Sequence, residues 1–148
     1  MASGTTDKGK YLMLKYSFDA ETVPTTYQII LCQGGSEPSP TKATDSLSSL
    51  TELAAGNGYT AGGKAITASD MTVTEVDGSV GAKMVVDDQQ WDATGAFPSS
   101  GDGARWAVLT DGTASGSNVL AYFDLTSDRT LVDGQFLKLT GIEIDLNE

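Results

Sequence analysis

Histidine is absent from this sequence of 148 residues, and cysteine occurs once, at Cys32. Without histidine the chain cannot build a Ser-His-Asp triad, a Cys-His pair or a histidine-ligated zinc site, and a single cysteine cannot form a disulfide within the chain. Cys32 lies in the apolar run YQIILCQG, where a cysteine typically behaves as a small buried hydrophobe. The inventory therefore excludes most of the common catalytic and metal-binding arrangements.

Basic residues are also scarce, nine against twenty acidic ones, which gives a net charge of −11. Such a surface repels nucleic-acid phosphates and anionic lipids, so we expect neither nucleic acid nor membrane as a partner. No apolar run approaches the about 20 residues of a membrane helix, and the polar start MASGTTDKGK lacks the apolar segment of a signal peptide. We therefore expect synthesis in a cytoplasm.

What the sequence does contain is short apolar stretches separated by turn residues. Eight of them predict strands, because they alternate or run apolar over short lengths: KYLMLKYSF, TYQIILCQ, MTVTEV, AKMVVDD, RWAVLTD, NVLAYFDL, QFLKLT and IEIDL. The dipeptides Asp77-Gly78, Asp111-Gly112 and Asp133-Gly134 suit tight hairpin turns and predict that consecutive strands pair antiparallel.

The stretch TDSLSSLTELAAGNG departs from this pattern. Leu47, Leu50 and Leu53 share one helical face, and Gly56 suits the end of a helix, so we predict one short helix from 45 to 55. The whole pattern predicts an all-β fold, an antiparallel β-sandwich of jelly-roll or immunoglobulin-like type with about seven to nine strands. We divide the chain into an N-terminal arm, 1–16, and a β-sandwich domain, 17–148.

The segment GYTAGGKA, 58–65, is similar to a phosphate-binding P-loop, in which a strand delivers the glycines and a helix follows. Here a predicted helix precedes Gly58, a strand-like stretch follows Lys64, and Ala65 replaces the Ser or Thr that holds magnesium. We therefore predict that the glycines form a tight turn, with Tyr59 as an anchor over the core.

Carboxylates offer two further kinds of site. The loops that contain DDQQWD, GDG, TDG and TSD could collect calcium incidentally, although no EF-hand pattern is present. A glycosidase pair could in principle come from Glu75, Asp87, Asp88 or Asp92, but sequence spacing does not place two carboxylates across a sugar. We expect solvated strand ends here, and hence no enzyme, no cofactor and no dedicated metal site.

Partner-binding candidates come from the aromatic and apolar residues. Trp106 alternates in phase with Val108, which favours the core, whereas Trp91 ends a strand and Phe97 precedes Pro98 in a loop. Trp91 and Phe97 are therefore the candidate contact residues, although a hydrophobic plug is the commoner role for such side chains. The arm adds an apolar centre that we expect to order on contact with a partner; its candidate residues are Tyr11, Leu12, Met13 and Leu14.

The order of six segments resembles that of small structural proteins from the virions of tailed bacteriophages. These segments are YQIILCQ, GNGYTAGGKAIT, VVDDQQWDA, ARWAVLTDG, NVLAYFDL and VDGQFLKL. The resemblance spans about 25 to 146, and its most specific part is GYTAGG with the downstream order W, ARWAVL and DG. It implies a β-sandwich that has no catalytic role and is located in the virion.

On this basis we expect a capsid decoration, or cement, protein that binds the major capsid protein on the assembled head, forms a homo-oligomer and stabilises the shell. A tail-fibre or head-fibre attachment domain is the alternative within the same family. A carbohydrate-binding module that uses Trp91 and Phe97 is the alternative from another class. Location in the particle separates the first two, and binding to immobilised glycans tests the third.

Overall fold

A computed structural model describes residues 3–76 and 81–145, in which the strands pair antiparallel and one α-helix is present, α1 (Asp7–Phe18). The all-β class is therefore confirmed, with ten strands in the described residues. They are β1 (Ser3–Thr5), β2 (Thr26–Gln33), β3 (Lys64–Thr67), β4 (Met71–Val76), β5 (Gly81–Val86), β6 (Gln89–Asp92), β7 (Ala104–Thr110), β8 (Val119–Arg129), β9 (Phe136–Leu139) and β10 (Ile142–Asp145).

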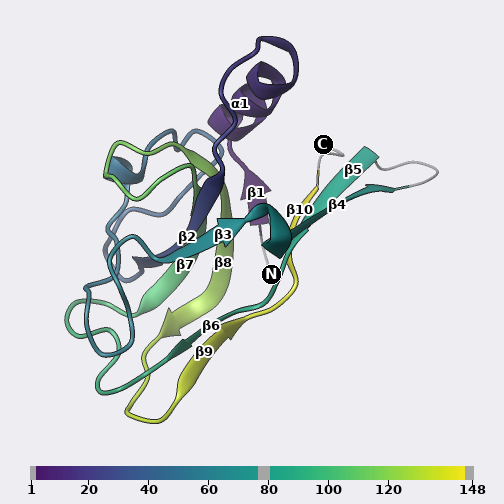
Figure 1. Ribbon diagram of the computed structural model, residues 1–148. Coiled ribbons are helices and arrows are strands. Elements are labelled where there is room, and N and C mark those ends of the chain that lie inside the picture. The colour runs from purple at the N-terminus through teal and green to yellow at the C-terminus, as the bar shows by residue number, and fades with distance from the viewer. Residues whose placement is uncertain (1–2, 77–80, 146–148) are drawn as a thin grey trace.

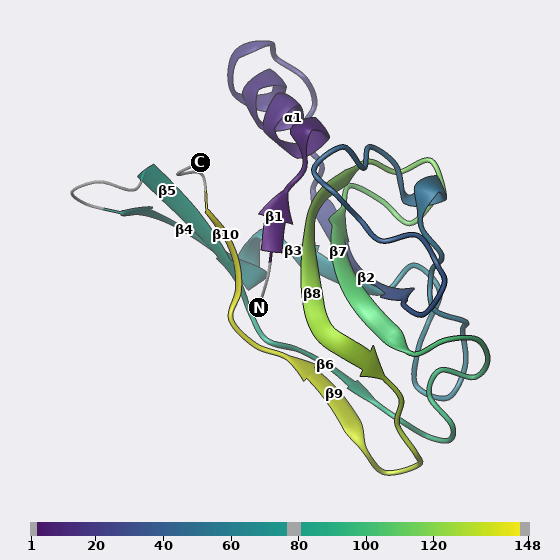
Figure 2. The same ribbon diagram turned by 180° about the vertical axis from the view of Figure 1, so that it is seen from behind.

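Three sheets make up the body. The largest has the order β1-β8-β7-β2-β3, a second has the order β10-β5-β4, and β6 pairs with β9. Because β5 leads into β6 and β9 leads into β10, the two smaller sheets form one long bent ribbon that runs beside the large sheet (Figures 1 and 2). Helix α1 projects from one end of the large sheet (Figure 1).

The large sheet is buried on both faces, which explains why β2 reads as a continuous apolar run. On one face Ile29 and Leu31 belong to the main core cluster, which the ribbon completes with residues such as Trp91. On the other face Ile30 and Cys32 belong to a smaller cluster. Cys32 is fully buried, as the sequence predicts, and burial raises the pKa of its thiol to about 12.

The predicted turns have different outcomes. Asp111-Gly112 does begin the loop between the paired strands β7 and β8. Asp133-Gly134 forms a turn in which Gly134 has a φ of +82°, but the turn leads to β9, which pairs with β6 and not with the preceding β8. Asp77-Gly78 lies outside the described residues.

The predicted helix at 45–55 is wrong. Only Leu47–Ser49 form a single 3-10 turn, and Leu50 is already extended. The backbone beyond it bonds to β2 instead of to itself, since the N–H of Gln33 donates to the carbonyl of Thr51 and the N–H of Leu53 donates to the carbonyl of Leu31. Leu47 is buried within the 3-10 turn, and Leu53 is buried where the chain bonds to β2.

The N-terminal segment also differs from the prediction of a separate arm and a strand. β1 pairs with β8 and α1 packs on β8, so the segment belongs to the domain, and the proposed boundary at residue 16 falls inside α1. The sequence DKGKYLMLKYSF contains no β-branched residue and is rich in Leu, Met and Lys, which favour helix. Apolar residues alone do not distinguish a short strand from a short helix. Here the absence of β-branched residues favours the helix.

Candidate interaction surface

Helix α1 is apolar on two opposite faces. Leu12 and Met13 are half-buried against the main core cluster. Tyr11, Leu14 and Phe18 follow the spacing i, i+3, i+7, which places them together on one face, and their exposed fractions are 54%, 61% and 85%. We call these three residues the α1 stripe. Of the four predicted arm candidates, Tyr11 and Leu14 are thus available to a partner, and Leu12 and Met13 hold the helix on the body.

Helix α1 packs closely on β8. Thr6 caps the helix, and its buried hydroxyl accepts a hydrogen bond from the N–H of Gly9 at 2.9 Å and donates one to the carbonyl of Val119 at 2.5 Å. A β-carbon at Gly9 would lie 2.3 Å from the carbonyl oxygen of Leu120, so only glycine permits this approach. The α1 stripe is therefore presented from a fixed position.

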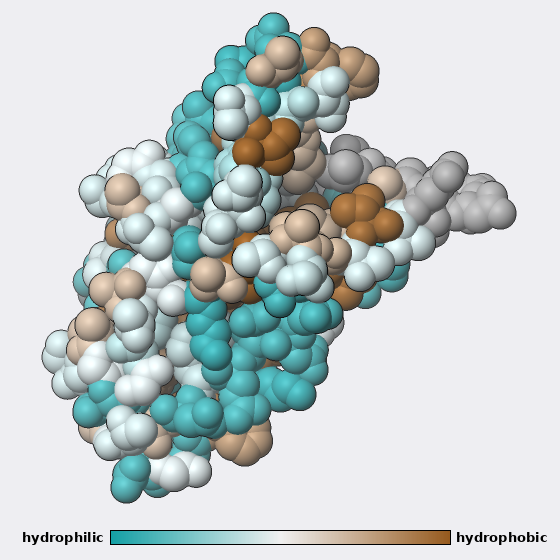
Figure 3. All heavy atoms as spheres, in the orientation of Figure 1, coloured by the Kyte–Doolittle hydropathy of each residue, from teal (hydrophilic) through white to brown (hydrophobic). Residues whose placement is uncertain are grey.

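Charged residues of both signs flank the stripe, since three lysines lie on the helix and Asp19 and Glu21 follow directly after it. The helix carries Lys8, Lys10 and Lys15 against one acid, Asp7, and so holds three of the nine basic residues of the chain. The Nζ atoms of Lys8 and Lys15 lie 5.8 and 5.6 Å from the ring centroid of Tyr11. The space-filling view shows hydrophobic surface around α1 and on the ribbon of β4 and β5 (Figure 3).

Lys15 is also tied to the chain that follows the helix. Its ammonium lies 2.8 Å from a carboxylate oxygen of Glu21, and this hydrogen bond and charge raise the pKa of Lys15. The N–H of Asp19 donates to the carbonyl of Lys15 and closes the last turn. The flank of the stripe is thus ordered by local contacts.

The prediction that Trp91 and Phe97 are surface contact residues is wrong, because they are only 2% and 1% exposed. Trp91 lies in the main cluster, with the Nζ of Lys64 at 5.5 Å from its ring centroid. Phe97 packs edge-on against Tyr59, with ring centroids 6.4 Å apart. Both fill the core, and the carbohydrate-binding alternative loses the two residues on which it depended.

The glycine-rich segment forms the predicted turn. Gly58 and Gly63 have φ angles of +103° and +69°, which favour glycine, and strand β3 starts at Lys64 where a P-loop would start a helix. A β-carbon at Gly58 would lie 2.0 Å from the carbonyl oxygen of Asp92. The glycines therefore serve a tight turn packed against the neighbouring chain.

Tyr59 anchors this turn, as predicted. Its ring is buried, and its hydroxyl donates to the Glu52 carboxylate at 2.8 Å and accepts from the N–H of Leu31 at 3.2 Å. Glu52 also accepts from the N–H of Gly62 at 2.6 Å. Burial and the adjacent carboxylate raise the pKa of Tyr59, so the phenol stays neutral and works as a structural link.

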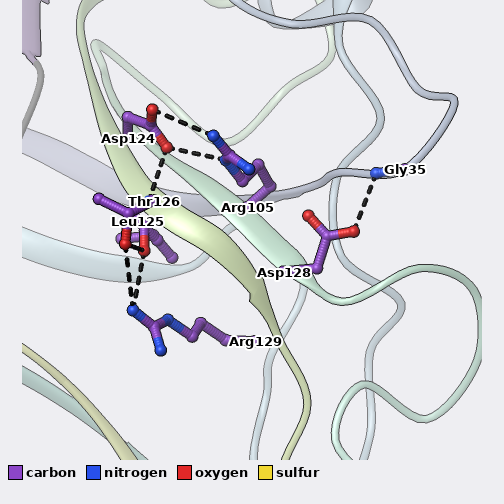
Figure 4. Close-up of polar contacts among 7 residues, drawn as sticks. All are labelled: Gly35, Arg105, Asp124, Leu125, Thr126, Asp128 and Arg129. Carbon is purple, nitrogen blue, oxygen red and sulfur yellow. Dashed lines mark hydrogen bonds and ion pairs between the residues drawn. The ribbon is translucent and has the colours of Figure 1, made fainter.

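A cluster of charged residues on and beside β8 was not predicted from the sequence (Figure 4). Arg105 makes a two-bonded pair with Asp124, at 2.8 and 3.2 Å, which lowers the pKa of this carboxyl. Asp128 accepts from the N–H of Gly35, and Arg129 donates to the carbonyl of Leu125. These groups bond to one another and to the backbone, and so they secure the irregular end of β8.

The carboxylates considered for calcium or glycosidase chemistry do not share a common contact. Asp88 pairs with Lys138 at 2.9 Å, Asp92 accepts from Gln90 at 2.6 Å, and Asp87 is exposed. The side chain of Glu75 lies outside the described residues. Across 3–76 and 81–145, no three Cys, Asp or Glu side chains are grouped so that they could hold a metal ion.

In the same described part of the chain, no helix has the length and apolar character that crossing a bilayer requires. Comparison with known proteins gives no match to a family model, a curated protein or a solved structure. The α1 stripe is thus identified from its own geometry.

Proposed function

We propose that this protein is a structural component of a tailed-phage virion that binds the outer surface of the assembled head and stabilises the shell. The observation that carries the proposal is the α1 stripe, an exposed apolar surface with charged residues beside it on a helix that is fixed to the body. Exposed apolar patches with a polar rim typically mark protein interaction sites. The choice of a capsid as the partner rests on the order of short motifs in the sequence, from which we expect a virion structural protein.

The chemistry of the stripe defines the surface that it fits. Tyr11, Leu14 and Phe18 require an apolar groove, and the charged residues beside them suit a polar rim around it. Full burial of such side chains contributes about 1.5–3 kcal/mol each before the costs of association. We propose that the major capsid protein offers this groove only when assembled, so that binding stabilises the shell by mass action.

The test uses heads that lack the protein. The purified full-length chain should bind them at saturable, symmetry-related positions and raise the temperature at which they open. Phe18→Ser and Leu14→Ser should weaken binding without loss of fold, because both side chains are exposed in the free protein. Phe136→Ser is the matched control, since Phe136 is 58% exposed but lies on β9, away from the helix.

Three results would contradict the proposal. These are heads that open at the same temperature with and without the protein, equal binding by the Phe18→Ser and wild-type chains, and a position of the protein at the tail in a reconstruction of the particle. The last result would favour the fibre-attachment alternative, with the same stripe as its contact surface.

A further inference from the structure

Strand β4 lies at the edge of the three-stranded sheet and pairs with β5 on its inner side. Its register with β5 continues without a shift from Met71 to Val76. Edge strands in soluble proteins usually carry Pro, Lys or a bulge that prevents pairing with another chain. The sequence of β4, MTVTEV, contains neither Pro nor Lys and is rich in β-branched residues. Such an edge is a template for a further strand.

An apolar row leads out of the core to this edge. Ile144 of β10 pairs with Met84 of β5, which pairs with Val73 of β4, and residues paired in this way share one face of the sheet. Ile144 is 4% exposed and Met84 is half-buried, whereas Val73 is 72% exposed. The row therefore ends on an uncovered valine at the free edge of the sheet.

The backbone hydrogen-bonding groups of Val73 are also available at the free edge. The N–H of Asp87 donates to the carbonyl of Asp70 at 2.8 Å, one position beyond the Met71 and Val86 pair, which makes positions 70 and 87 a hydrogen-bonded pair. Hydrogen-bonded and non-hydrogen-bonded pairs alternate in an antiparallel ladder. Val73 is therefore in a non-hydrogen-bonded pair with β5, and its N–H and C=O face the free edge.

We propose that β4 pairs antiparallel with β4 of a second copy of this chain, across a twofold axis at Val73. In this register Val73 lies opposite the second copy's Val73 and continues the apolar row of each copy into the other. Thr72 lies opposite the second copy's Thr74, and pairs of threonine and of β-branched residues stabilise adjacent strands. The one charged residue of the strand, Glu75, lies opposite Met71 and not opposite its own copy.

The self-complementary register favours a second copy over an unrelated strand. A twofold contact also closes at two subunits, so it does not continue into a fibre. The interface is short, and each copy carries a net charge of −11, so we expect reversible association that added salt strengthens by screening the repulsion. This surface is separate from the α1 stripe, and the inference does not rest on the proposed function.

Sedimentation of the full-length chain over a concentration series, at low salt and at about 0.5 M salt, tests the association in free solution. We expect a monomer–dimer equilibrium that is tighter at the higher salt. Val73→Lys should raise the dissociation constant at least about tenfold. Val132→Lys is the matched control, because Val132 is 62% exposed in the turn before β9 and should leave the equilibrium unchanged.

Cross-linking tests the register. Opposed residues in a hydrogen-bonded antiparallel pair have Cα atoms about 5.5 Å apart, which suits a disulfide, whereas residues displaced by two positions are about 7–8 Å apart. Under mild oxidation Val73→Cys should therefore form covalent dimers in much higher yield than Thr72→Cys. The natural Cys32 is fully buried and does not compete.

The outcomes that overturn the inference are distinct. They are a wild-type chain that stays monomeric at every concentration, a dimer whose dissociation constant is the same in Val73→Lys, or equal cross-linking at positions 72 and 73. None of these outcomes depends on capsid heads, so failure here and failure of the head-binding test are separable.

Discussion

Replacement of Gly9 by alanine should detach helix α1 from its seat. The new β-carbon would lie 2.3 Å from the carbonyl oxygen of Leu120, about 1 Å closer than a tolerable contact, so the helix would have to move outward. That movement strains the hydrogen bonds of Thr6 to Gly9 and to the β8 backbone. Each such bond contributes about 1 kcal/mol, and the packing of Leu12 and Met13 on the core weakens with them.

Helix propensity acts in the opposite direction, because alanine is favoured over glycine inside a helix by about 1 kcal/mol. The balance predicts a net loss of about 1–3 kcal/mol of unfolding free energy, which for a chain of this size lowers Tm by roughly 3–10 °C. Circular dichroism during heating measures it. Ser17→Ala is the control, since Ser17 is exposed on the same helix and should gain a few tenths of a kcal/mol from propensity alone. A Tm for Gly9→Ala at or above that of Ser17→Ala would refute the argument that the helix is tightly seated.

Three further predictions concern the rest of the molecule. Gly58→Val should cost more than about 2 kcal/mol, because its positive φ and the nearby carbonyl of Asp92 both oppose a β-branched side chain, and an unchanged Tm would contradict this. Lys64→Ala should fold normally, with a loss of at most about 1 kcal/mol from its contact with the ring of a core tryptophan, and calorimetry should detect no ATP binding in it or in the wild type. Because Arg105 lowers the pKa of Asp124 from 3.8, the stabilisation by this pair is present above about pH 4 and is lost as the pH falls through the lowered pKa. In acid unfolding, Arg105→Met should therefore show a smaller decline of the unfolding free energy with falling pH than the wild type. Equal slopes of unfolding free energy against pH in the two proteins would exclude the pair as the source of the decline.

Strand positions were predictable from the sequence where apolar residues ran continuously or alternated over at least four residues. β2, β7 and β8 are of this kind, because both faces or one face of each are buried in the large sheet. Partner strands were less predictable. β9 follows β8 through a turn but pairs with β6, since the long bent ribbon brings together segments more than forty residues apart.

The errors at 45–55 and in the N-terminal segment have opposite causes. A leucine spacing of three is compatible with helix, but the segment from Thr51 to Leu53 gains its hydrogen bonds from β2, which local sequence does not reveal. In α1 the reverse holds, since local propensity gives the helix and its seat on β8 is distant in sequence. The α1 stripe was predictable in part, because Tyr11 and Leu14 were candidates. Phe18 is not among the predicted residues, because a strand over KYLMLKYSF would place it on the opposite face from Tyr11.

Trp91 and Phe97 show a further limit of local reasoning. A tryptophan at a strand end and a phenylalanine before proline have no neighbours in the sequence that would reveal burial. Their cover comes from the glycine turn and the ribbon, as the contact of Phe97 with Tyr59 illustrates. Exposure of an aromatic side chain in a loop therefore depends on contacts between distant segments.

The seat of α1 has a consequence for how the chain is made. The hydroxyl of Thr6 bonds to a carbonyl 113 residues further along the chain. At about 5–20 residues per second, the ribosome needs roughly 6–23 s after the helix is synthesised to complete its binding partner on β8. During that interval both apolar faces of the nascent helix are uncovered, so the helix is available to chaperones before it has a place to dock. Final closure of the domain therefore waits until β8 has been synthesised, and truncated chains that end before β8 should be the aggregation-prone species in an expressing cell.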